Sequence, residues 1–208
     1  MTVKLFVLGL PGSGKSSVAR YITAYLENKD WKSTRFSDHV ILQEMFLADT
    51  EHKRFRPADH GGFDALDLDV FDIALQRLEQ KVNQHLLSAK QEEIVLVEFA
   101  RNDYRGAFQQ FSHEFLQVAH FLYLNVNTET CKRRILERIA NPSSEDDFFV
   151  SEYIFDAYYN KGNEQSVPQI LERDYGIGKQ RVKVIENNGS LDDIVAEINE
   201  FVDTINGL

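Results

Sequence analysis

The chain has 208 residues, a formal net charge of −10 and 43% hydrophobic residues. This length suggests one domain, 1–208, with a sizeable core, and no apolar stretch approaches the ~20 residues that a membrane helix needs. The acidic balance argues against binding to extended nucleic acid, which requires concentrated lysine and arginine. Cys131 is the only cysteine, which excludes disulfides and cysteine-rich metal sites within one chain. Because no signal peptide precedes the first apolar segment, we expect a cytoplasmic protein with no membrane partner.

The predicted elements alternate between strands and helices along the chain. Strands are expected at Val3–Leu8, Ser33–Ser37, Ile94–Val97, Phe121–Val126 and Val182–Ile185, from apolar and β-branched runs. Helices are expected near 15–27, 39–48, 68–89, 107–118, 128–140, 152–160 and 191–205, from apolar residues at helical spacing. This alternation predicts an α/β fold with three layers and a five-stranded, mostly parallel sheet, in which Ile94–Val97 is central.

A glycine-rich loop connects the first strand to the first helix. It reads Gly9-Leu10-Pro11-Gly12-Ser13-Gly14-Lys15-Ser16, a complete G-x-x-x-x-G-K-[ST] pattern. In this strand, loop and helix context, backbone N–H groups and the helix N-terminus bind phosphates, the lysine reaches the β- and γ-phosphates, and the serine hydroxyl ligates Mg²⁺. The pattern therefore predicts a P-loop NTPase fold that binds ATP or another nucleotide with magnesium. The loop residues expected to bind nucleotide are Gly9, Pro11, Gly12, Ser13, Gly14, Lys15, Ser16 and Ser17.

Two polar stretches, 50–67 and 141–149, resist assignment to a helix or strand. Long loops in a compact domain are usually functional or disordered, and both follow helices that we expect near the carboxyl edge of the sheet, where ligands bind in such folds. We therefore expect an acceptor-binding insert at 39–90 and a small helical lid at 141–165.

Asp38 directly follows the second predicted strand, so it should lie at the same sheet edge as the loop. A carboxylate there can position or deprotonate an acceptor hydroxyl, or help to hold the metal. The alternative is that Asp38 is the N-cap of the next helix. His39 is expected to be a surface or supporting residue.

Glu98 and Arg101 follow the third predicted strand. An acidic residue in this place holds Mg²⁺ in phosphate-loop proteins, directly or through water. Arg101 is a candidate to clamp an acceptor phosphate or the transferring group, and a structural salt bridge is its alternative.

Three arginines lie on the helix predicted at 128–140. Arg134 and Arg138 are four residues apart and share a face, so both are predicted to contact the nucleotide and Arg134 to take part in catalysis. Arg133 and the nearby Glu137 allow an ordinary surface pair instead. Arg54 and Arg56, in the polar loop, are weaker candidates for the acceptor.

The sequence resembles the P-loop kinases of nucleosides, nucleotides and small metabolites. The loop is similar to those of adenylate-kinase-like and polynucleotide-kinase-like members, and Asp38 occupies the place of their acceptor-positioning acid. Val97-Glu98-Phe99-Ala100-Arg101 resembles the Asp-Gly-Phe-Pro-Arg of nucleoside monophosphate kinases, although the acid is displaced by one. Arg134 and Arg138 are similar to lid-hinge arginines of adenylate kinases, and Asn187-Asn188-Gly189-Ser190 to the turn that packs on adenine. Residues 141–161 lack the paired lid arginines, which argues against an ordinary adenylate kinase.

The resemblance implies an ATP-dependent kinase that transfers the γ-phosphoryl group to a small-molecule or nucleotide acceptor. Its expected catalytic residues are Lys15, Asp38, Arg101 and Arg134, and its expected metal ligands are Ser16 and Glu98. The alternatives are a nucleotide-dependent regulatory ATPase or switch, and a kinase of a nucleic-acid end or of a protein. A GTPase is disfavoured because Asn160-Lys161-Gly162-Asn163 lacks the aspartate that reads guanine.

Overall fold

The computed structural model describes residues 2–58, 62–89, 93–140, 154, 155, 159 and 166–206. Its centre is a five-stranded sheet in the order β2-β5-β1-β6-β7, and every neighbouring pair of strands is parallel. These strands are β1 (Thr2–Leu8), β2 (Lys32–Ser37), β5 (Glu93–Phe99), β6 (Ala119–Asn125) and β7 (Val182–Glu186). The predicted α/β fold with a five-stranded sheet is confirmed. The strand at the centre is β1, and β5 lies between it and the edge strand β2, which corrects the expectation that Ile94–Val97 is central.

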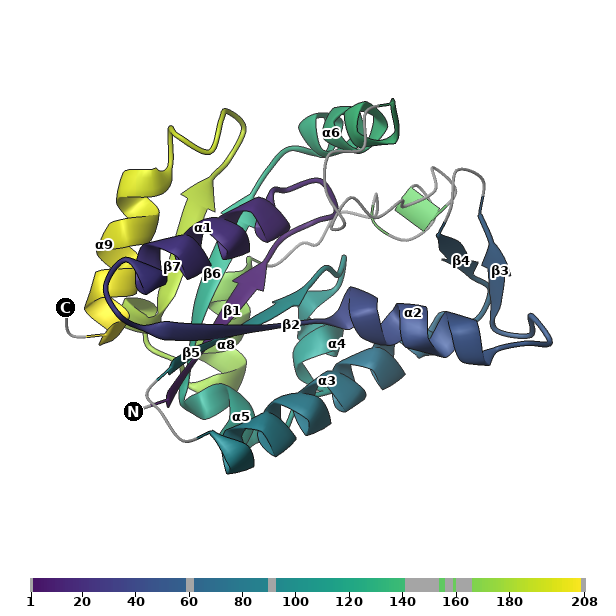
Figure 1. The fold of residues 1–208 in the computed structure, drawn as a ribbon, viewed down its shortest axis with the longest axis horizontal. Helices are drawn as coiled ribbons and strands as arrows, with labels where there is room; N and C mark the ends of the chain where they lie inside the picture. The colour runs from purple at the N-terminus through teal and green to yellow at the C-terminus, as the bar shows by residue number, and fades with distance from the viewer. Residues whose placement is uncertain are drawn as a thin grey trace.

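Helices cover both faces of the sheet (Figure 1). One face carries α1 (Lys15–Glu27) and α9 (Val195–Asn206). The other face carries α3 (Asp69–Ser88), α4 (Tyr104–Phe108), α5 (His113–Gln117) and α8 (Val167–Tyr175). Two further helices, α2 (Asp38–Ala48) and α6 (Thr128–Ala140), extend from the carboxyl ends of β2 and β6, and a short 3-10 helix, η2 (Lys179–Arg181), precedes β7.

The side chains of β1 alternate between two cores. Val3, Leu5 and Val7 are buried against α1 and α9, whereas Phe6 and Leu8 are buried in the core beneath α3, α4 and α8. A strand that is covered on both faces has no solvent side, so its sequence is apolar at successive positions. This explains why Val3–Leu8 is apolar except at Lys4, which is itself buried and has its Nζ 4.0 Å from the centroid of the Phe115 ring.

The strand register brings the expected site residues to one edge of the sheet. Leu8, the last residue before the glycine-rich loop, is paired with Phe99, and Ser37 is paired with Glu98. Because these strands are parallel, their carboxyl ends meet at the same edge. The loop after β1, the start of α2 and the end of β5 are therefore neighbours in space.

Several elements differ from the sequence-based expectations. The polar stretch 50–67 contains a short antiparallel hairpin, β3 (Phe55–Pro57) and β4 (Phe63–Ala65). The helix expected at 107–118 is two helices, because Ser112 caps α5 through the N–H of Phe115 and starts a second helix. The last helix begins at Val195 rather than at 191.

The expected lid at 141–165, and the helix expected within it, lie outside the described residues apart from Ile154, Phe155 and Tyr159. Among the residues that the structure describes, no helix combines the length and the apolar composition needed to cross a membrane.

Candidate active site

The glycine-rich loop is packed tightly against two other segments, which explains its glycines. Gly12 has φ +80°, and a Cβ atom there would lie 2.4 Å from the carbonyl oxygen of Cys131 in α6. Gly14 has φ +95°, and a Cβ atom would lie 2.7 Å from Nδ2 of Asn187. Both the left-handed conformation and the close approach exclude larger residues. The loop is thus held between α6 and the turn after β7.

Lys15 lies within the curve of this loop. Its Nζ donates hydrogen bonds to the carbonyl oxygens of Gly9, at 3.1 Å, and Leu10, at 2.9 Å. Burial lowers the pKa of Lys15, while the neighbouring carboxylates of Glu98 and Asp38 raise it. A buried ammonium group beside N–H groups of an uncapped helix start is an environment that favours a bound anion.

Tyr104 lies in α4, on the face of the sheet opposite to α1, and contacts the first glycine of the loop. The N–H of Gly9 donates a 2.7 Å hydrogen bond to the buried Tyr104 hydroxyl oxygen, and burial raises the pKa of Tyr104 well above its ordinary value. Asn187 has a similar role, since its Nδ2 donates to the carbonyl oxygen of Ser13 at 2.8 Å. The contact of Tyr104 was not predicted, because no local pattern signals a partner 95 positions away.

Ser16 and Glu98 meet as the sequence predicts. The Ser16 hydroxyl donates to Oε1 of Glu98 at 2.8 Å, and Arg35 in β2 pairs with Oε2 of the same carboxylate at 2.9 Å. A hydroxyl and a carboxylate oxygen side by side suit Mg²⁺, which is usually held by one or two protein oxygens together with substrate phosphates. In the described part of the chain, no three His, Cys, Asp or Glu side chains form a metal-binding group.

Asp38 lies at the same edge but is not the N-cap of α2. The side chain of Ser37 caps this helix by accepting from the N–H of His39, which corrects the N-cap alternative for Asp38. The Asp38 carboxylate instead pairs with Nη1 of Arg101 at 2.5 Å. Arg101 is only 1% exposed, and its Nη2 also donates to the carbonyl oxygen of Phe71 at 2.6 Å. This geometry favours the salt-bridge interpretation of Arg101.

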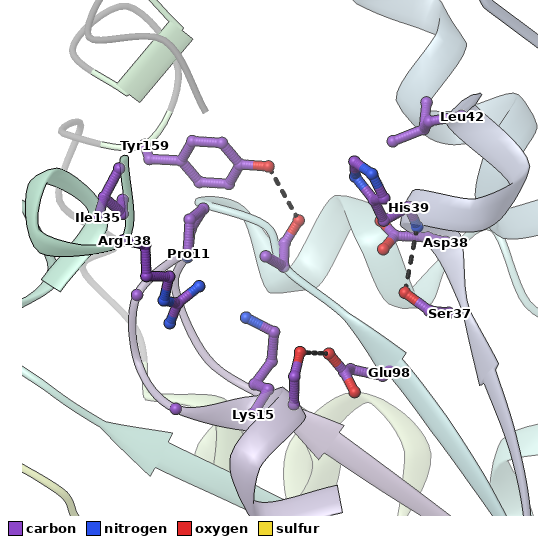
Figure 2. A pocket seen from close by; sticks show the side chains of 14 residues that line it. Pro11, Lys15, Ser37, Asp38, His39, Leu42, Glu98, Ile135, Arg138 and Tyr159 are labelled. Atoms are coloured by element: carbon purple, nitrogen blue, oxygen red, sulfur yellow. Dashed lines mark hydrogen bonds between the residues drawn. The ribbon is translucent and has the colours of Figure 1, made fainter. Parts of the chain in front are cut away.

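One pocket joins these groups (Figure 2). The loop, Lys15 and Arg138 lie on one side, and Asp38, His39 and Leu42 lie opposite them. Glu98 is at the base, and the Tyr159 hydroxyl faces the carbonyl oxygen of Ala100 at 3.4 Å. Arg101 does not line the pocket, and its buried guanidinium group pairs with the Asp38 carboxylate.

A second pocket adjoins the first beyond Gly14. It is lined by residues of α1, α6 and the turn after β7, namely Gly14, Ser17, Arg134, Glu137, Arg138, Asn187, Gly189 and Leu191. Arg134 connects α6 to the turn after β7 and to the glycine-rich loop, because its guanidinium donates to the carbonyl oxygens of Gly189 at 2.6 Å and Gly12 at 3.5 Å. The predicted pair Arg134 and Arg138 therefore lines a pocket beside the start of α1 and the turn after β7.

Other candidate arginines lie elsewhere. Arg133 pairs with Glu137 at 2.7 Å on the exposed face of α6, as the surface alternative predicts. Arg54 and Arg56 do not line the pocket, and they pair with the carboxylates of Asp67 and Asp64 at 2.6 and 3.1 Å. In the described residues, the candidate site thus brings together the loop, Asp38, Glu98 and the pair on α6.

We expect Glu98→Gln to raise the Mg²⁺ concentration that gives half-maximal activity by about tenfold, because an uncharged amide holds neither the metal nor its water as well. The measurement is a magnesium titration at saturating ATP. Glu44→Gln is a matched control, since Glu44 lies on the surface of α2 and pairs with the exposed Lys81 of α3. An unchanged magnesium dependence in Glu98→Gln would argue against a role in metal binding.

Comparisons with known proteins agree with this fold. Residues 5–155 match the profile of a family described as "AAA domain". No curated protein sequence matches the chain. Among solved structures, it is similar to a sugar kinase from Janibacter sp. HTCC2649 (TM-score 0.59, 12% identity, 98% of this chain and 96% of that chain covered). It is also similar to Chaetomium thermophilum Kti12 in complex with ADP-AlF3 (0.60, 15%, 97% and 98%) and to Mycobacterium tuberculosis APS kinase CysC (0.57, 15%, 97% and 98%). At these identities, the likeness shows that the chain has the P-loop kinase fold.

Proposed function

The chain belongs to the AAA domain family, and from this premise we propose that it is an ATP-dependent phosphotransferase acting on a small-molecule or nucleotide acceptor. The observation that carries the proposal is the arrangement of one pocket, in which the phosphate loop with Lys15 faces the Asp38 carboxylate. A switch needs a phosphate loop, but it does not need a carboxylate placed opposite the terminal phosphate. Transfer to a hydroxyl needs such a group.

The donor half of the site follows from the two adjoining pockets. We place the triphosphate of ATP on the loop, where Lys15 and the N–H groups at the start of α1 contact it. The nucleoside then lies in the second pocket, beside Arg134 and Arg138. Ser16 and Glu98 would hold Mg²⁺, which when bound neutralises charge on the phosphates.

The transfer step follows from the position of Asp38. Its carboxylate orients the acceptor hydroxyl towards the γ-phosphorus and accepts its proton as the new phosphorus–oxygen bond forms. The bond between the γ-phosphorus and the β,γ-bridging oxygen breaks in the same step, and ADP is the leaving group. Arg101 holds Asp38 in this position from behind, so it is a positioning residue in this proposal. Lys15 and Arg138, which face the transferring group from the loop side, stabilise its charge.

The test is a transfer assay with radiolabelled ATP and a panel of metabolites and nucleosides. The proposed kinase hydrolyses little ATP alone and labels an acceptor when the right one is added. Acceptor-independent hydrolysis, or binding of a protein partner that depends on the nucleotide, would favour the regulatory ATPase instead.

We expect Asp38→Asn to lower kcat for transfer by about 10²–10⁴-fold, because the amide cannot accept the hydroxyl proton. The dissociation constant for Mg·ATP should change little, since Asp38 lies on the acceptor side of the pocket. Calorimetry measures the binding, and thermal melting verifies the fold. Asp203→Asn, on α9 at a half-buried ion pair with Lys29, is the control. Unchanged transfer by Asp38→Asn would refute the role of Asp38 and leave nucleotide binding in place.

A further inference from the structure

We propose that the acceptor is an uncharged hydroxyl compound, such as a polyol, a sugar or a nucleoside, rather than a phosphorylated, sulfated or carboxylated one. This inference rests on the proposed function and narrows it. It follows from the charges around the pocket, because a buried anion requires cationic hydrogen-bond donors that are not already neutralised.

The cations that line the pocket lie on its loop side. Among the described lining residues, the lysine and arginine side chains are Lys15 and Arg138. Lys15 lies within the phosphate loop, and Arg138 also lines the second pocket, so both belong to the donor. The Mg·ATP complex retains net negative charge and needs both of them. Neither can also neutralise an anionic acceptor.

Two arginines that contact pocket-lining residues already neutralise buried carboxylates. Arg101 pairs with Asp38 at 2.5 Å, and Arg35 pairs with Glu98 at 2.9 Å. The exposed fractions of Asp38 and Glu98 are 6% and 4%. Turning either arginine towards a substrate would leave its carboxylate buried without a counter-charge, which is strongly unfavourable.

In the described part of the hairpin next to α2, neither arginine lines the pocket. Arg56 pairs with Asp64, which is 4% exposed, and Arg54 pairs with Asp67. An acceptor with a phosphate or carboxylate group would therefore find these arginines, in the described part of the chain, already paired with carboxylates.

The acceptor side instead presents uncharged and acidic groups. Leu42 and Ala100 provide apolar surface, and Asp38 provides the carboxylate that a substrate hydroxyl can donate to. The Tyr159 hydroxyl points into the pocket from the side of Ile135 and Arg138 (Figure 2). The His39 ring stacks on Phe63 at a centroid distance of 5.7 Å. Such a lining recognises a neutral molecule by shape and hydroxyl hydrogen bonds.

The first experiment compares acceptors that differ by one ionised group, at pH 8, where imidazoles carry little charge. The pairs are glycerol with glycerol 3-phosphate, and adenosine with adenosine monophosphate. We expect kcat/KM to be at least about tenfold higher for the neutral member of any pair that is phosphorylated. Equal or faster transfer to the charged member overturns the inference and leaves the proposed kinase function standing.

The second experiment does not require the true acceptor. The protein is saturated with Mg²⁺ and a nonhydrolysable ATP analogue, and inorganic sulfate is then titrated in. We expect no saturable sulfate binding by the wild type, and saturable binding by His39→Arg, which places a cation on the acceptor side. Sulfate binding by the wild type, or a folded His39→Arg that binds no more than the wild type, overturns the inference. Binding of the ATP analogue is measured before sulfate is added. If the analogue does not bind, the proposed function itself is refuted.

Discussion

Lys15→Ala is expected to lower phosphoryl transfer by at least about 10²–10³-fold and to weaken Mg·ATP binding. Lys15 is the ammonium group within the phosphate loop, and its Nζ donates to the carbonyl oxygens of Gly9 and Leu10. A triphosphate in the loop would replace these carbonyl acceptors with anionic phosphate oxygens, so that both the donor and the acceptor carry charge. No other lysine lines either pocket in the described part of the chain.

The loss should not come from unfolding. Because burial lowers the pKa of Lys15 in the folded protein, its charge costs stability below that pKa, and the cost disappears as the pH rises through the unfolded value. Removing the ammonium at pH 7 is therefore expected to leave the melting temperature unchanged or higher. Calorimetry with Mg·ATP and thermal melting measure both effects. Lys53→Ala is the control, since Lys53 is exposed and pairs with Glu51. Wild-type ATP affinity in Lys15→Ala would contradict the assignment of the loop.

Arg101→Met is expected to destabilise the fold by about 3–5 kcal/mol, because it leaves the buried Asp38 carboxylate without its counter-charge. Arg101 is 1% exposed, and its guanidinium pairs with Asp38 and donates to the carbonyl oxygens of Ala100 and Phe71, both at 2.6 Å. It also lies 5.1 Å from the centroid of the Phe71 ring. The methionine replaces the apolar part of these contacts and none of the hydrogen bonds.

Urea denaturation measures this loss, and a double-mutant cycle identifies its origin. Asp38→Leu combined with Arg101→Met should destabilise less than the sum of the two single changes, since the double variant leaves no unpaired charge. Arg133→Met is the matched control, because the pair of Arg133 with Glu137 is exposed and contributes at most about 1 kcal/mol. If Arg101→Met is as stable as Arg133→Met, Arg101 does not support Asp38 in the way proposed.

The strands and the helix that the sequence analysis missed are short. The hairpin of β3 and β4 has three residues in each strand, too few for an alternating pattern. Helix α8 was not predicted, although Ser166, Pro168 and Gly176 mark its two ends. These three are ordinary start and stop signals, and they would have identified the helix if combined with the buried Ile170 and Leu171.

The sequence by itself determined the phosphate loop, the parallel sheet and the edge where Asp38 and Glu98 lie. Each of these follows from short-range rules, namely glycine conformation, apolar periodicity and the common direction of parallel strands. Only the tertiary structure decided which partners these groups have. The pairs of Asp38 with Arg101, Glu98 with Arg35 and Gly9 with Tyr104 join residues 63 to 95 positions apart. Such contacts depend on how the layers pack, and no local pattern encodes them, so the role of Arg101 and the charge of the acceptor side could be read only from the folded chain.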